Sequence, residues 1–145
     1  MTQNSRPVVL VFAGNDPTGG AGIQADIETL TSLGCHPAPV ITALTVQDTV
    51  GVKHYMPVEA GMVIAQARAV LEDMPVAAFK AGMLGSAENA TALAAIMQDY
   101  PDIPLILDPI LASGRGDPLA DDALADALQS LLIPQATLVT PNTLE

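Results

Sequence analysis

Residues 14–26 read GNDPTGGAGIQAD, in which an Asp-Pro pair precedes three glycines within four positions. The run before them, residues 8–13, is continuously apolar, which is typical of a buried β-strand. In the residues after them, apolar side chains recur at helical spacing, at Ile23, Ile27, Leu30 and Leu33. The glycines therefore mark the point at which a buried strand turns into a helix.

A glycine-rich junction of this kind is typical of a ligand-binding loop, although a tight connection without a ligand is the alternative. The first N–H groups of a helix have no partner inside the helix, and the helix dipole favours an anion or an electron-rich polar ligand there. Glycine also lets a ligand approach the backbone without meeting a Cβ atom. The junction is therefore the first candidate for a binding site.

Two familiar phosphate-binding motifs fit this stretch only in part. The spacing from Gly14 to Gly19 is that of a P-loop, but the Lys and Ser or Thr that should follow are absent. A dinucleotide-binding fingerprint fits from Gly20 to Ala25, but it begins too far beyond the strand, and no acidic residue closes the second strand. A nicotinamide-dependent dehydrogenase is therefore the weaker alternative.

The rest of the chain alternates between strand and helix patterns with short connections. Strands are predicted at residues 40–46, 76–81, 103–107 and 136–140, helices at 57–74, 86–100 and 120–132, and an exposed turn or short strand at 47–52. This alternation predicts one α/β domain over residues 1–145, with a mainly parallel sheet and helices on both faces in a Rossmann-like, three-layer arrangement. The last strand is expected inside the sheet with nothing after it to cover it, so we expect the chain to be part of a larger protein.

The composition limits the classes of binding partner and the cellular compartment that we expect for this chain. The formal net charge of −11 argues against nucleic acid or an anionic membrane as a partner. Cys35 is the single cysteine, which excludes an internal disulfide and is typical of a reducing compartment. No signal peptide or membrane span is predicted, so we expect a cytoplasmic protein. Homo-oligomerisation is left open.

Polar and glycine residues follow the predicted strands, and the carboxyl ends of parallel strands form the usual ligand site. These ends are Gly14-Asn15-Asp16, Thr45-Val46-Gln47, Gly82-Met83-Leu84, Asp108-Pro109 and Thr140-Pro141-Asn142. Asp108 is interpreted either as a cap or turn residue before Pro109 or as a carboxylate that holds Mg²⁺ beside phosphates. Lys80 either pairs with such a carboxylate or lies on the outer rim of the sheet. His36 and His54 are expected to be structural or to face solvent.

Taken together, these residues resemble the hydroxymethylpyrimidine/phosphomethylpyrimidine kinases of thiamine biosynthesis, in the ribokinase superfamily. The matching runs are residues 13–26, 40–49, 80–84, 107–109 and 140–142, which span nearly the whole chain in order. The resemblance implies a ribokinase-like fold and phosphorylation of a small pyrimidine substrate, first at its hydroxymethyl group and then at the monophosphate, with ATP and Mg²⁺. It also leaves two alternatives: a pyridoxine- or pyridoxal-type kinase, and a sensor that binds the pyrimidine without catalysis.

The resemblance assigns a role to each of seven residues. It places Gly14, Asp26, Gln47 and Met83 in the pyrimidine pocket, Asp108 and Glu145 toward Mg²⁺ and the ATP phosphates, and Asn142 toward the nucleotide. It places no catalytic residue in this chain, because the family carries its anion hole, its hydroxyl-activating residue and most of its adenine site in a second half. The chain alone is therefore expected to be inactive, as the N-terminal part of a kinase domain.

The sequence departs from the family pattern at three places. Asn15 replaces a usual Ser or Thr, and Asp48 replaces a usual Asn. Gly114-Arg115 stands where a Lys-Ser pair is common, so the resemblance supports a cationic role for that loop only through Arg115.

Overall fold

Six strands form one sheet within residues 6–114, 116, 118–143 and 145, which the computed structural model describes. The strand order is β3-β2-β1-β4-β5-β6, with every neighbouring pair parallel except β2 and β3. The elements in chain order are β1 (Val8–Gly14), α1 (Gly22–Ser32), β2 (His36–Gln47), β3 (Val52–Pro57), α2 (Ala60–Asp73), β4 (Val76–Ala81), α3 (Ala87–Asp99), β5 (Leu105–Leu107), α4 (Asp122–Ala127) and β6 (Leu138–Val139). The predicted α/β class with a mainly parallel sheet is confirmed.

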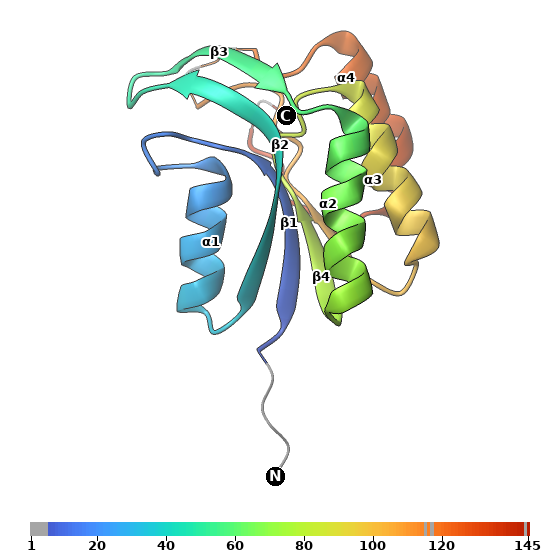
Figure 1. Ribbon diagram of the computed structural model, residues 1–145. Coiled ribbons are helices and arrows are strands. Elements are labelled where there is room, and N and C mark those ends of the chain that lie inside the picture. Colours follow the sequence, from blue (N-terminus) through green and yellow to red (C-terminus); the bar gives the residue numbers. More distant parts are fainter. Residues whose placement is uncertain (1–5, 115, 117, 144) are drawn as a thin grey trace.

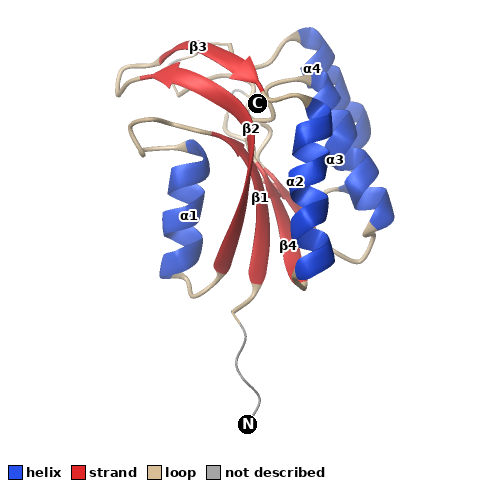
Figure 2. Ribbon diagram, viewed as in Figure 1, coloured by secondary structure: helices blue, strands red, loops and turns tan. Residues whose placement is uncertain are grey.

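Helices cover both faces of the sheet, as the continuous apolar strands require (Figures 1 and 2). Of the helices that the structure describes, α1 lies on one face, where Ile23, Ile27 and Leu30 pack against β1. Helices α2, α3 and α4 lie on the other face and enclose the larger core, in which Phe12 and Phe79 meet edge to face with ring centroids 6.2 Å apart. All seven residues of β1 are buried, which confirms the prediction of a buried strand before the glycine-rich junction.

Strand β2 is longer than its apolar pattern predicted, and its two halves have different partners. Its first half pairs with β1 as far as Ala43, and its second half pairs with the antiparallel strand β3. The prediction of a helix from residue 57 was therefore wrong at its start, because 52–57 form β3 and α2 begins at Ala60. Glu59 caps α2 by accepting hydrogen bonds from the N–H groups of Gly61 and Met62.

The last elements also differ from the prediction. Helix α4 begins at Asp122, because the Asp121 side chain caps it by accepting from the N–H of Leu124 at 2.8 Å. It then continues as a π-helical segment and a 3₁₀ turn that contains Pro134, and this geometry suits a proline near a helix end. The predicted last strand shrinks to two residues and lies at the edge of the described sheet, with Leu138 half exposed.

Neighbouring residues determine several local features. Gly34 follows α1 with a φ of +80°, and the Ser86 side chain caps α3 by accepting from the N–H of Asn89 at 3.2 Å. Cys35 is a half-buried residue packed beside α1 and β1, and the two histidines, His36 and His54, face solvent. Among the described residues, no helix has both the length and the apolar character needed to cross a membrane.

Candidate functional site

A cavity of about 470 Å³ opens at the carboxyl edge of the sheet. The ends of β1, β4, β5 and β6 contribute to it, together with the start of α1 and the β2–β3 hairpin, whose strands arch over this edge in Figure 1. Its lining residues are Gly14, Asn15, Asp16, Ala21, Gly22, Gln47, Val52, Met83, Asp108, Ile110, Ala112, Ser113, Gly114, Leu119, Thr140, Pro141, Asn142 and Glu145. The structure thus brings six of the seven predicted site residues to one cavity, and Asp26 lies outside its lining.

The glycine-rich loop closes tightly under this cavity. A Cβ atom on Gly22, whose φ is +57°, would lie 2.3 Å from the carbonyl oxygen of Gly14, so only glycine permits this approach. The buried Asp16 orders the loop by accepting hydrogen bonds from the N–H and the hydroxyl of Thr18 at 2.8 and 2.9 Å. Helix α1 then begins at Gly22 without a side-chain cap, and Gly22 and the preceding Ala21 both line the cavity. The predicted strand-to-helix junction is therefore a preformed part of the cavity wall.

Asn15, one of the departures from the family pattern, joins the end of β1 to β2. Its side-chain oxygen accepts from the N–H of Thr45 at 2.8 Å, and its backbone carbonyl accepts from the Thr45 hydroxyl at 2.8 Å. The same hydroxyl lies 3.2 Å from Oε1 of Gln47. Because Thr45 is buried and held from both sides, this chain of contacts fixes the base of the hairpin that carries Gln47.

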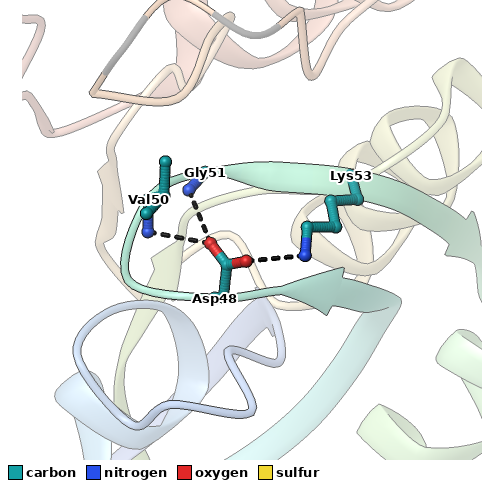
Figure 3. Close-up of polar contacts among 4 residues, drawn as sticks. All are labelled: Asp48, Val50, Gly51 and Lys53. Carbon is teal, nitrogen blue, oxygen red and sulfur yellow. Dashed lines mark hydrogen bonds and ion pairs between the residues drawn. The ribbon is translucent and has the colours of Figure 1, made fainter.

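Asp48, a second departure, organises the turn between β2 and β3 (Figure 3). Its carboxylate accepts from the N–H groups of Val50 and Gly51 at 2.8 and 3.1 Å and forms an ion pair with Lys53 at 2.7 Å. The ion pair with Lys53, aided by the two N–H donors, lowers the pKa of Asp48 to about 2. This exposed turn holds together two residues of the cavity lining, Gln47 before it and Val52 after it.

Met83 forms an apolar part of the cavity wall and is nearly buried. Its Sδ atom would lie 3.1 Å from a Cβ atom placed on Gly14, so the glycine leaves room for the thioether. Sequence reasoning did not single out the other apolar lining residues, Val52, Ile110 and Leu119, which cluster with Met83. Only their proximity in the fold reveals them, because an isolated apolar residue in a loop, or at the start of a short strand such as β3, carries no signal of its own.

The positive charge of Lys80 acts on two acidic residues near the cavity, Asp26 and Asp108. Lys80 on β4 forms an ion pair with Asp26 of α1, with Nζ 2.9 and 3.0 Å from the two carboxylate oxygens. Lys80 therefore pairs with Asp26 rather than directly with Asp108. Burial raises the pKa of Asp108, the positive charge of Lys80 opposes this shift, and the negative charges of Glu145 and Asp26 add to it.

Asp108 and Glu145 are carboxylates of the cavity lining that could contribute ligands to a divalent cation. Within the described part of the chain, no hydrogen bond engages the half-buried carboxylate of Asp108, and the negative charge of Glu145 acts on it. Glu145 accepts hydrogen bonds from the N–H groups of Leu111 and Asn142, and its N–H donates to the Asn142 side chain. No cluster of three or more metal-binding side chains occurs among the described residues, so these two carboxylates would need phosphate or water oxygens as further ligands. Arg115, proposed as a cation for this loop, lies outside the described residues.

Comparisons with known proteins show the family of the chain. The family model for phosphomethylpyrimidine kinase matches residues 16–145. The hydroxymethylpyrimidine/phosphomethylpyrimidine kinase of Mycobacterium tuberculosis is 45% identical over 137 residues, a match covering 94% of this chain and 50% of that protein. The chain thus spans about half the length of the curated relatives it matches.

Solved structures extend the likeness to the fold. The crystal structure of phosphomethylpyrimidine kinase from Clostridium difficile superimposes with a TM-score of 0.87 at 36% identity, over 94% of this chain and 59% of that one. Pyridoxal kinase of Bacillus subtilis, solved as an ADP complex, superimposes with a TM-score of 0.83 at 27% identity, over 97% of this chain and 52% of that one. These matches exclude the alternative of a nicotinamide-dependent dehydrogenase. The chain belongs to the phosphomethylpyrimidine kinase family.

Proposed function

We propose that the chain carries the pyrimidine-binding half of a cytoplasmic, ATP- and Mg²⁺-dependent hydroxymethylpyrimidine/phosphomethylpyrimidine kinase of thiamine biosynthesis. The observation that carries the proposal is the joint position of Gln47, Met83 and Asp108 on one cavity at the carboxyl edge of the sheet. The amide of Gln47 can hydrogen-bond to a neutral heterocycle, and Met83 can make an apolar contact with its ring. The carboxylate of Asp108 suits a site at which such a ligand receives a phosphoryl group.

In this proposal the pyrimidine lies between the glycine-rich loop and the β2–β3 hairpin. The Gln47 amide offers both a donor and an acceptor to an aminopyrimidine edge, and its contact with the Thr45 hydroxyl restricts its orientation. Met83 contacts the ring with a polarizable thioether, and Val52 closes the apolar side. Asp26 would contribute to the pocket through its ion pair with Lys80, which links α1 to β4.

The phosphate side of the proposal rests on the two carboxylates. Asp108 and Glu145 would hold Mg²⁺ with the help of phosphate oxygens, and Asn142 would lie toward the nucleotide. Bound there, the ion would neutralise charge on the transferring phosphate. A nearby cation would also favour the ionised form of Asp108, which burial and the neighbouring acids otherwise disfavour. The residues that activate the substrate hydroxyl are assigned to no position in this chain.

The experiment that tests the proposal is calorimetric binding of 4-amino-5-hydroxymethyl-2-methylpyrimidine to the chain and to Gln47→Leu. The leucine leaves the polar edge of the ligand unpaired, which should cost about 1–3 kcal/mol, or roughly 5- to 150-fold in affinity. Gln135→Leu is a matched control, because Gln135 is exposed and, within the described part of the chain, its amide bonds only to the carbonyl of Leu131. Binding that is unchanged in Gln47→Leu, or absent in the parent chain, contradicts the proposal.

A pyridoxal-type kinase is the second candidate, favoured by the likeness to the Bacillus subtilis enzyme. The two candidates differ in the ligand edge that Gln47 would meet, because a pyridoxine ring has one nitrogen where the aminopyrimidine has two, and it carries no amino group. Competition between the two ligands in the same calorimetric assay separates the candidates. A tighter affinity for pyridoxine or pyridoxal than for the aminopyrimidine would favour the second one.

A further inference from the structure

The segment between β4 and α3, residues 82–85, is buried although it has no regular secondary structure. A buried backbone needs partners for its carbonyl and N–H groups, because an unpaired polar group away from water is costly. In this segment two side chains from outside it provide partners. The hydroxyl of Thr42 on β2 donates to the carbonyl of Met83, and the amide of Asn89 on α3 donates to the carbonyl of Leu84 at 2.9 Å.

Asn89 also ties the segment to β2 and to the residue after β3. Its Nδ2 donates to the carbonyls of Thr42 and Val58, both at 3.1 Å, in addition to that of Leu84. The side chain is fully buried, and its Oδ1 has no partner among the described residues. Three carbonyls around Nδ2 set the orientation of the amide, since the reversed orientation would place an acceptor against three acceptors.

The backbone around these contacts leaves little room for adjustment. Gly85 has a φ of +81°, and a Cβ atom on it would lie 3.0 Å from Cβ of Ala43 and 3.4 Å from the carbonyl of Thr42. The segment is therefore pressed against β2 at the point where β2 leaves β1. Met83, whose carbonyl Thr42 holds, is the one residue of this segment in the cavity lining.

We infer that Thr42 and Asn89 are positioning residues, which together hold Met83 in the cavity wall without touching the ligand themselves. The inference rests on the proposed function only for the ligand that Met83 contacts. Sequence patterns gave no sign of it, because one residue lies inside a strand and the other inside a helix. The physical reason is that the two hydrogen bonds replace the secondary structure that the 82–85 segment lacks.

The test uses the full chain labelled with ¹³C at the methionine methyl groups, with Met83→Leu to assign the Met83 signal. Thr42→Val keeps the shape of the side chain and removes the donor, whereas Thr42→Ser keeps the hydroxyl. Thr91→Val is the matched control, because Thr91 is exposed on α3 and its hydroxyl bonds, among the described residues, only to the carbonyl of Ala87 in its own helix. Asn89→Asp removes the amide donor at nearly constant size.

We expect the Met83 methyl signal of the ligand-free chain to shift or broaden in Thr42→Val and Asn89→Asp, and to keep its position in Thr42→Ser and Thr91→Val. In parallel, calorimetry should show that hydroxymethylpyrimidine binds about 3- to 10-fold more weakly to Thr42→Val, as the loss of one neutral hydrogen bond predicts. If Asn89→Asp does not fold, Thr42→Val decides alone.

The two readouts separate this inference from the proposed function. A Met83 signal that is the same in Thr42→Val as in the parent overturns the positioning role, whatever the ligand does. A parent chain that does not bind the pyrimidine refutes the proposed function, while the methyl signals still decide whether Thr42 and Asn89 position Met83. Equal changes in Thr42→Val and Thr91→Val would show a nonspecific effect of losing a threonine and would overturn the inference as well.

Discussion

Replacing Gly22 by alanine tests how strictly the glycine-rich loop is determined by its backbone. The new Cβ atom would lie 2.3 Å from the carbonyl oxygen of Gly14 and 3.3 Å from its carbonyl carbon. Non-bonded heavy atoms settle at about 3.5 Å, so the loop must open by about 1 Å. Alanine must also adopt a φ of +57°, in the left-handed region that L-residues avoid.

The two costs can be separated with a control just after the other end of α1. Overpacking of this size costs about 1–3 kcal/mol, and the left-handed conformation costs about 1–2 kcal/mol, so Gly22→Ala should lose about 2–5 kcal/mol of stability. Gly34 has a φ of +80°, but a Cβ atom there meets nothing within 4 Å. Gly34→Ala should therefore show the conformational cost alone, about 1–2 kcal/mol, reduced by the lower chain entropy of alanine in the unfolded state.

The assay is equilibrium urea unfolding of the parent chain and both variants, followed by circular dichroism. The free energy of unfolding should fall about 1–3 kcal/mol further in Gly22→Ala than in Gly34→Ala, with a melting temperature lower by about 3–4 °C per kcal/mol. The carbonyl of Gly14 lies at the cavity wall, so ligand affinity should fall in Gly22→Ala and stay unchanged in Gly34→Ala. Equal destabilisation of the two variants would falsify the close approach of Gly22 to Gly14.

Three further predictions concern the charges of Asp108 and Asp48 and the activity of the chain assayed alone. Asp108→Asn should raise the free energy of unfolding at pH 7, because burial and the charges of Glu145 and Asp26 raise the pKa of Asp108; urea titrations should show the gain vanish below the ordinary value of 3.8, where the carboxyl is protonated in both states. The same variant should lose any Mg²⁺-dependent stabilisation by ATP, and a variant that is less stable at pH 7 would contradict the reasoning. Asp48 should titrate at about 2 in carboxyl-detected NMR, so that its contribution to the turn is complete above 3.8 and lost as pH falls toward 2; Lys53→Met should move the midpoint upward, and an unmoved midpoint would count against the ion pair. The 145-residue chain alone should not phosphorylate hydroxymethylpyrimidine with ATP and Mg²⁺, because no lysine or arginine is among the described residues that line the cavity; a turnover of about 1 s⁻¹ or more in a coupled assay would show that the catalytic groups are present.

Much of the fold follows from local patterns in the sequence. The continuous apolar run of β1 and the helical spacing after Gly22 locate the central strand and α1, because burial on both faces of a sheet leaves no polar alternation. Capping at Ser86 and the left-handed Gly34 were also predictable, since each depends only on neighbouring residues. The carboxyl edge as the place of the cavity follows from the alternation of strands and helices.

Other features depend on contacts between distant residues, which no local pattern encodes. β3 was missed because Val52–Pro57 carries too weak an apolar pattern, and only its pairing with the far half of β2 makes it a strand. The partner of Lys80 could not be predicted from the sequence, because Asp26 is 54 residues away. The two side chains meet only because the fold brings Asp26 of α1 within reach of Lys80 on β4.

The cavity wall shows the same division. Its glycines, Gln47 and Asp108 stand out in the sequence because each residue type carries a chemical meaning at the end of a strand. The hydrogen bonds from Thr42 and Asn89 to the carbonyls of Met83 and Leu84 do not, since a threonine in a strand and an asparagine in a helix are ordinary residues there. Local sequence determined the elements and the chemical types at their ends, because these depend on backbone conformation and burial. Tertiary structure alone decided which side chains meet, because hydrogen bonds and ion pairs between distant segments form only once the sheet has brought those segments together.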